Sequence, residues 1–393
     1  MSTRKTKPDT VLTHAGRNPS ANYGMVNPPV YHASTVLFDS MDDLSEAYKS
    51  QYAHYTYGRV GTPTSRAFEE VVTELEGGHA AVSASSGLSA IALALDSFTK
   101  AGDHVLIADS VYAPTRNFCD KVLSRRGVVI EYYDPLVGAD IDRLVRPETS
   151  LIFMESPGSL TFEIQDVPAI ASVARRRGIV TIIDNTWATP LFFKPFEHGV
   201  DVSLHAATKY MVGHADAMLG VVVCATQDHF LTVKKNAHVQ GICAGPDDLY
   251  LGQRGLRSMA VRLRHHEQAA LEVARWLRSR PEVDRVLHPA LPDDPGHALW
   301  SRDFTGSCGL FSFVLKPFDR AAVNRMVDHM DLFGIGFSWG GFESLITPQD
   351  PSTSRSVTRW EAAGPLVRLH IGLEDIEDLK ADLEAGLRRL SQG

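Results

Sequence analysis

A carboxylate and an amine each follow an apolar strand candidate in the most informative stretch of the sequence. The run Val180–Asp184 closes on its aspartate, and the next candidate, Val202–His205, leads into Ala-Ala-Thr-Lys-Tyr, which contains Lys209. Ligands of an open α/β sheet collect at the carboxyl ends of its strands, so we expect both side chains in one cleft. A single Asp or Lys is more often a turn residue or a surface cation. The two together, each after a buried strand, indicate a site.

Pyridoxal phosphate is a cofactor that needs such a pair. A lysine joins its aldehyde as an imine, and an acid keeps its ring nitrogen protonated so that the ring accepts electrons. The run Ser83–Ser89 adds a third feature, because its small residues lead from a strand into an Ala- and Leu-rich helix. Backbone N–H groups there could approach a phosphate, although such turns are as often plain helix caps. The run matches neither the dinucleotide nor the P-loop pattern.

Short apolar runs alternate with helical stretches from about residue 61 and must position these residues. Strands that are apolar along their whole length are typical of a mostly parallel sheet buried on both faces. The predicted strands are Ala80–Ser83, His104–Ala108, Val128–Tyr132, Leu151–Glu155, Val180–Asp184, Val202–His205 and Leu219–Cys224, and the predicted helices are Gly87–Thr99, Ala113–Arg126 and Ala169–Arg177.

The remainder of the chain divides into an N-terminal arm and a smaller C-terminal region. Residues 1–60 are rich in proline and irregular, but their tyrosines and apolar residues suggest an ordered arm that lies against something. After about residue 256 we expect an α+β region with helices Arg262–Ser279 and Asp375–Leu390 and strands Leu310–Val314 and Val367–His370. The expected parts are therefore an arm (1–60), a cofactor-binding domain (61–255) and a C-terminal domain (256–393).

Composition narrows the class of protein. The chain has 393 residues, of which 44% are hydrophobic and 22% charged, as in an ordinary globular protein. Its four cysteines show neither disulfide nor zinc spacing, and His265–His266 lacks metalloprotease spacing, so we expect no metal. The net charge of −8 and the absence of a basic block argue against nucleic acid as a partner. Without a signal peptide or a bilayer-length apolar run, we expect a cytoplasmic protein with no membrane partner.

Nine motifs run in order over nearly the whole chain. On them the chain resembles the Cys/Met-metabolism family of pyridoxal-phosphate enzymes, and within it the bacterial β-lyase branch. The motifs are Tyr55–Arg59, Ser86–Gly87, Tyr112, Glu155–Pro157, Asp184–Trp187, Ala207–Tyr210, Arg254–Arg257, Ser338–Ser344 and Val367–Gly372.

This resemblance implies an α/β fold of the fold-type I transferase class, with pyridoxal 5'-phosphate as cofactor. It implies that Lys209 forms the Schiff base, that Asp184 pairs with the pyridinium and that Tyr112 stacks on the ring. Lys209 would also remove the substrate's α-proton, and Lys209 or Tyr112 would protonate the leaving thiolate.

Further roles follow from the same resemblance. Gly87, Leu88 and Thr208 would contact the phosphate, the first two through backbone N–H groups. Tyr57 and Arg59 would reach the phosphate of a neighbouring subunit, which implies at least a dimer and suggests a dimer of dimers.

On the substrate side, Arg368 would grip the α-carboxylate with its planar fork. Ser338 and Trp339 would line the substrate space.

Three positions depart from the wider family pattern. Ala206 replaces a serine that could contact the phosphate, Trp339 replaces a leucine of many γ-acting members, and Gly158–Ser159 replaces Asn-Pro. The last two match the β-lyase branch, and a tryptophan would narrow the cavity or pack on the substrate. It could equally be a core filler.

The implied activity is β-elimination on L-cystathionine to homocysteine, pyruvate and ammonia, in methionine biosynthesis. A γ-lyase or γ-synthase of the same family is the nearest alternative, followed by a β-lyase of cysteine, cystine or S-conjugates. A non-catalytic interaction module is a further alternative, which the joint presence of Tyr112, Asp184, Lys209 and Arg368 argues against.

Overall fold

The larger part of the fold is built around a mixed, mostly parallel sheet of seven strands. The computed structural model describes residues 6–391. The strand order is β1-β7-β6-β5-β4-β2-β3, with β7 antiparallel to both of its neighbours and the remaining pairs parallel. The predicted α/β class is therefore confirmed. The strands are β1 (Ala80–Ala84), β2 (His104–Ala108), β3 (Val129–Tyr133), β4 (Thr149–Glu155), β5 (Val180–Asp184), β6 (Val202–His205) and β7 (Gly220–Cys224).

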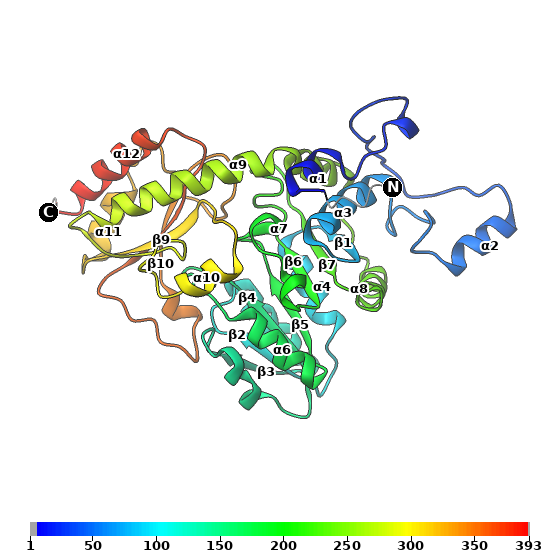
Figure 1. The fold of residues 1–393 in the computed structure, drawn as a ribbon, viewed down its shortest axis with the longest axis horizontal. Helices are drawn as coiled ribbons and strands as arrows, with labels where there is room; N and C mark the ends of the chain where they lie inside the picture. The colour runs from blue at the N-terminus through cyan, green and yellow to red at the C-terminus, as the bar shows by residue number, and fades with distance from the viewer. Residues whose placement is uncertain (1–5, 392–393) are drawn as a thin grey trace.

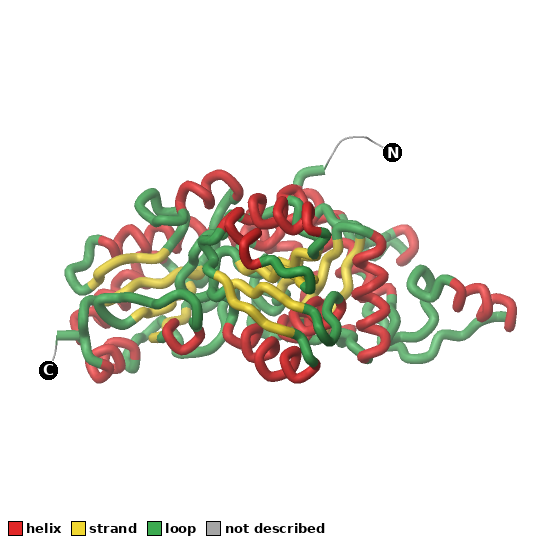
Figure 2. Tube along the Cα trace, turned by 90° about the horizontal axis from the view of Figure 1, so that it is seen from below, coloured by secondary structure: helices red, strands yellow, loops and turns green. Residues whose placement is uncertain are grey.

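Helices cover both faces of this sheet, and Figure 2 shows the strands as a layer with helices above and below. None of the helices within residues 6–391 combines the length and apolarity that a bilayer crossing requires. The helices are α1 (Pro8–His14), α2 (Met41–Lys49), α3 (Pro63–Glu76), α4 (Gly87–Ser97), α5 (Ala113–Phe118), α6 (Val167–Arg177), α7 (Thr189–Phe192), α8 (Gln227–Gln240), α9 (Pro246–Arg278), α10 (His297–Asp303), α11 (Arg320–Val327) and α12 (Ile376–Arg389).

A second, antiparallel sheet lies in the C-terminal part of the chain. Its order is β10-β11-β9-β8, from strands β8 (Val283–Leu287), β9 (Leu310–Leu315), β10 (Leu345–Gln349) and β11 (Leu366–His370). Figure 1 shows α9 running from the region of the larger sheet to the smaller one. The boundary that we expected at residues 255 and 256 falls inside this helix, and the division into domains stays a prediction.

Several elements differ from the predicted ones: the predicted helix Ala113–Arg126 is α-helical only over Ala113–Phe118, and strand β8 was missed. Packing explains two further differences. Helix α9 begins at Pro246 rather than Arg262. Gly252 and Gly255 look like helix breakers in the sequence, but in the helix they allow neighbouring segments to pack closely. A Cβ on Gly255 would lie 2.3 Å or less from the carbonyl oxygens of Met211 and Val212. The missed strand β10 contains Pro348 and lies at a sheet edge, where a missing N–H is tolerated.

The N-terminal arm is more regular than expected, since it forms α1 and α2. Helix α1 lies against α9, where Arg257 donates to the carbonyl oxygens of Leu12 and Ala15 at 2.6 and 3.0 Å. Helix α2 projects away from the rest of the chain in Figure 1. The arm exposes large apolar side chains, including Tyr23 at 96% and Leu37 at 89% of their surface.

A buried carboxylate at the end of α3 fixes the strand ends that lead to the predicted site. Glu76 is hydrogen-bonded to His205 Nε2 at 3.1 Å, to Asn185 Nδ2 at 3.3 Å and to the Ser203 hydroxyl. Burial alone would raise the pKa of Glu76, but His205 and Ser203 outweigh it and lower the pKa. One ionised side chain therefore ties together the ends of β5 and β6.

Candidate active site

A cavity of about 490 Å³ lies at the carboxyl ends of β4 and β5, with β11 on its other side. It gathers nine of the eleven residues that the sequence predicts for the site. These are Gly87, Leu88, Tyr112, Asp184, Thr208, Lys209, Ser338, Trp339 and Arg368.

Lys209 presents its amine in this cavity, on the turn after β6. Its Nζ lies 2.5 Å from Ser338 Oγ and 5.2 Å from the centre of the Trp339 ring. Burial and the positive charge of Arg368 lower the pKa of Lys209 to about 8, although Asp184 opposes them. The cavity thus holds an amine that becomes neutral, and hence nucleophilic, far more readily than an ordinary lysine.

Two carboxylates lie side by side in the same cavity. Glu155 and Asp184 end the parallel strands β4 and β5 and are register partners. Burial raises the pKa of both groups, and the charge of Asp184 raises that of Glu155 further. Thr186 opposes the shift at Asp184, donating to Oδ1 from its N–H at 2.9 Å and its hydroxyl at 2.5 Å. A cationic ring N–H would find a favourable partner here.

Glu155 is a cavity residue that the sequence reasoning did not assign. Its Oε2 accepts the backbone N–H of Tyr112 at 2.7 Å, at the start of α5. The signal was present, because Glu155 ends the strand candidate beside the one that ends in Asp184. The apolar lining residues Leu160, Phe162 and Phe337 were also missed, and they lie on loops whose sequence gives no periodic signal.

The side of the cavity built from the smaller sheet carries a guanidinium. Arg368 lies on β11 and donates to the carbonyl oxygen of Ser338 at 3.3 Å. Burial lowers its pKa. Ser338 has a left-handed φ of 78°, and the next residue, Trp339, packs on Tyr210 with 5.5 Å between ring centres.

The N-terminus of α4 completes the cavity with backbone N–H groups. Ser86 Oγ accepts the N–H of Ser89 at 3.1 Å, while the earlier N–H groups, of Gly87 and Leu88, have no intrahelical acceptor. A Cβ on Gly87 would lie 2.4 Å from the Ala206 Cβ, so only glycine lets the helix end come so close to the lysine turn. An amine, an acid, an aromatic ring and an anion cradle are the groups that pyridoxal phosphate requires.

Thr208, Tyr57 and Arg59 are the other three residues predicted to contact the phosphate, and they differ from Gly87 and Leu88 in position or in hydrogen bonding. The Thr208 hydroxyl lines the cavity but is hydrogen-bonded with the backbone of Leu219, accepting at 2.9 Å and donating at 3.1 Å. Tyr57 and Arg59 line a separate cavity of about 390 Å³, where Arg59 donates to the carbonyl oxygen of His238. Their supply to a neighbouring subunit stays a prediction.

The chain is similar to known proteins over nearly its whole length. Residues 9–388 match the family described as Cys/Met metabolism PLP-dependent enzyme. A Rhizobium johnstonii protein named putative cystathionine beta-lyase is 49% identical, over 98% of this chain and 96% of its own. Escherichia coli cystathionine beta-lyase is 44% identical, over 98% and 99% of the two chains.

Relatives with other names are similar to the chain as well. A Wolbachia pipientis protein named L-alanine/L-glutamate racemase is 42% identical over 98% of both chains. The crystal structure of cystathionine gamma synthase from Xanthomonas oryzae pv. oryzae superimposes with a TM-score of 0.90 at 31% identity, covering 98% of this chain and 99% of that one. With its motifs, fold and cavity in agreement, the chain belongs to the Cys/Met-metabolism family of enzymes that depend on pyridoxal phosphate.

Proposed function

We propose that this chain is a cystathionine β-lyase, which cleaves L-cystathionine to homocysteine, pyruvate and ammonia. The observation that carries the proposal is the meeting of Lys209, Asp184 and Arg368 in one cavity. The names of the more similar relatives support the β reaction over the γ reaction, and so do Trp339 and Gly158, which both line the cavity.

The same residues would hold the cofactor. Lys209 would hold it covalently through its amine, Asp184 would face the ring nitrogen, and the N–H groups of Gly87 and Leu88 would bind the phosphate. Pyridoxal phosphate, when bound, withdraws electrons from the substrate's α-carbon. Tyr112 would lie against its ring.

The chain itself then performs binding and proton transfer. Arg368 holds the α-carboxylate through charge-assisted hydrogen bonds. The neutral amine of Lys209 accepts the α-proton, and the Ser338 hydroxyl, 2.5 Å from that amine, orients it. As the Cβ–S bond breaks, the leaving thiolate takes a proton from Lys209 or from the Tyr112 phenol. Burial and Glu155 raise the pKa of Tyr112, which keeps this phenol protonated.

Amino-acid racemisation is a second candidate. The named racemase among the relatives favours it, and Lys209 and Tyr112 line the same cavity. Removal of the α-proton by one of these groups and its return from the other would invert the α-carbon.

We further propose a cytoplasmic homotetramer that acts in methionine biosynthesis. Tyr57 and Arg59 lie outside the main cavity of their own chain, as expected of residues that serve a neighbour. The exposed apolar side chains of the arm, Leu37 and Tyr23 among them, would be covered in such an assembly.

A product assay on a panel of sulfur amino acids tests the reaction. Cystathionine should give pyruvate and homocysteine in equal amounts, because the leaving group is on Cβ. Release of 2-oxobutyrate and cysteine would contradict β-elimination and indicate the γ reaction. The D-alanine formed from L-alanine in the same samples measures racemisation.

Cofactor loading should depend on pH through Lys209. Only the neutral amine reacts with the aldehyde, so the rate at which the cofactor-free chain takes up pyridoxal phosphate should rise about tenfold per pH unit below the pKa. It should level off above pH 8, because the pKa of Lys209 is about 8 rather than 10.5. Stopped-flow absorbance measures this rate. A rate that still rises steeply at pH 10 would show that Lys209 titrates normally.

Substitution of Arg368 should weaken substrate binding more than turnover. Arg368→Ala removes hydrogen bonds to a charged carboxylate, which contribute about 1.5–3 kcal/mol, so KM for cystathionine should rise roughly 10- to 100-fold. Arg368→Lys keeps the charge without the planar fork, so its KM should lie between those of the unaltered protein and Arg368→Ala. Steady-state kinetics provide the measurement, and an unchanged KM in Arg368→Ala would remove the assigned role.

A further inference from the structure

One wall of the substrate cavity is a short loop whose backbone must be held in place. Residues 157–160 and 162, directly after β4, line the cavity. Leu160 and Phe162 have left-handed φ angles of 68° and 60°, a conformation that costs free energy in residues other than glycine. Ser159 N–H donates to the carbonyl oxygen of Ser110 at 2.8 Å, which ties the loop to the residues that follow β2 of the larger sheet.

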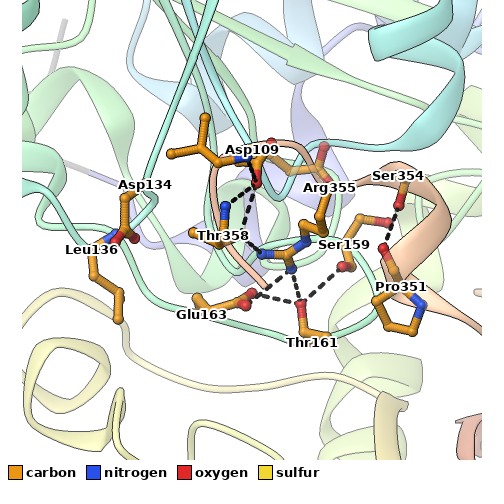
Figure 3. Close-up of polar contacts among 12 residues, drawn as sticks. Asp109, Asp134, Leu136, Ser159, Thr161, Glu163, Pro351, Ser354, Arg355 and Thr358 are labelled. Atoms are coloured by element: carbon orange, nitrogen blue, oxygen red, sulfur yellow. Dashed lines mark hydrogen bonds and ion pairs between the residues drawn. The ribbon is translucent and has the colours of Figure 1, made fainter. Parts of the chain in front are cut away.

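The loop is also held by its own backbone hydrogen bonds, from Gly158 N–H to Glu163 O at 2.9 Å and from Phe162 N–H to Gly158 O at 3.0 Å. A further restraint comes from the chain between β10 and β11. The Arg355 guanidinium points at the loop (Figure 3), where it donates to the Thr161 hydroxyl and to Glu163 Oε1, the latter at 3.0 Å. Thr161 in turn donates to Glu163 Oε2 at 2.7 Å. The Arg355 side chain is only 7% exposed, so this charged contact is shielded from water and is stronger than a surface ion pair.

The segment that carries Arg355 is itself fixed to the larger sheet. The fully buried carboxylate of Asp109, just after β2, accepts the N–H groups of Ser356, Val357 and Thr358 at 2.8–3.2 Å. Burial alone would raise the pKa of Asp109, but these hydrogen bonds outweigh it and lower the pKa to about 2. The anchor is therefore ionised at any working pH.

We propose that Arg355 is a positioning residue that sets the width of the substrate slot between the wall loop, residues 157–162, and Arg368. The same chain segment continues into β11, which carries Arg368. The contacts of Arg355 with Thr161 and Glu163, here called the clamp, therefore fix the position of the wall loop relative to Arg368. Arg355 does not line the cavity and acts through the loop. The inference rests on the proposed function, because it concerns how the amino-acid substrate of that reaction is held.

Arg355→Ala tests the clamp through two readouts. Hydrogen–deuterium exchange of a peptide covering residues 157–163 should become at least tenfold faster, because the loop loses the side-chain contacts that tie it to the segment before β11. KM for cystathionine should rise about tenfold or more, with kcat within about threefold and the cofactor's affinity and absorbance unchanged. Millimolar guanidinium should restore KM in this variant, and Arg355→Lys should give an intermediate KM.

Arg359→Ala is the matched control, since Arg359 is an exposed arginine of the same segment. It should leave both readouts unchanged. Unaltered exchange and KM in Arg355→Ala would overturn the inference, and so would a loss of cofactor affinity that accompanies the rise in KM. The exchange measurement needs no turnover, so a failure of the proposed reaction, seen as no pyruvate from the unaltered protein, is distinguishable from a failure of the clamp.

Discussion

The burial of an ionisable amine and two carboxylates in one cavity is the constraint on which the rest of the structure depends. Lys209, Asp184 and Glu155 all follow or end strands of the larger sheet, and none of the three could be removed from water without compensation. The compensation comes from the surroundings, because Thr186 hydrogen-bonds Asp184, the Tyr112 backbone donates to Glu155, and Ser338 contacts Lys209. The result is a set of shifted pKa values in one cavity, which is typical of catalytic sites.

The second sheet supplies the guanidinium that we propose binds the substrate's carboxylate. Its strand β11 supplies Arg368, and the loop before β11 supplies Arg355 and the backbone donors that Asp109 accepts. Long-range hydrogen bonds of this kind join the two sheets beside the cavity, in addition to apolar packing that includes Leu310 of β9. Helix α9 spans both parts, and its buried Arg262 donates to the carbonyl oxygen of Tyr210, next to Lys209.

Much of the larger sheet could be predicted from sequence, because its strands are apolar along their length and end in residues with chemistry. The strand His104–Ala108 matches β2, and Val180–Asp184 matches β5. Motif resemblance then identified the cavity residues, nine of which lie together. The Glu155 contact with Tyr112 could not be read in the same way, since it joins residues 43 positions apart. Neither could the Arg355 clamp, whose partner Glu163 is 192 positions away.

Borohydride reduction of the protein loaded with pyridoxal phosphate, followed by peptide mapping, tests the central claim most directly. Reduction makes the covalent attachment permanent, so the modified residue can be identified by mass spectrometry. The cavity predicts a single label on Lys209, the lysine whose amine is buried beside Asp184 and Arg368. A label on any other lysine, or no label at all, would contradict the account.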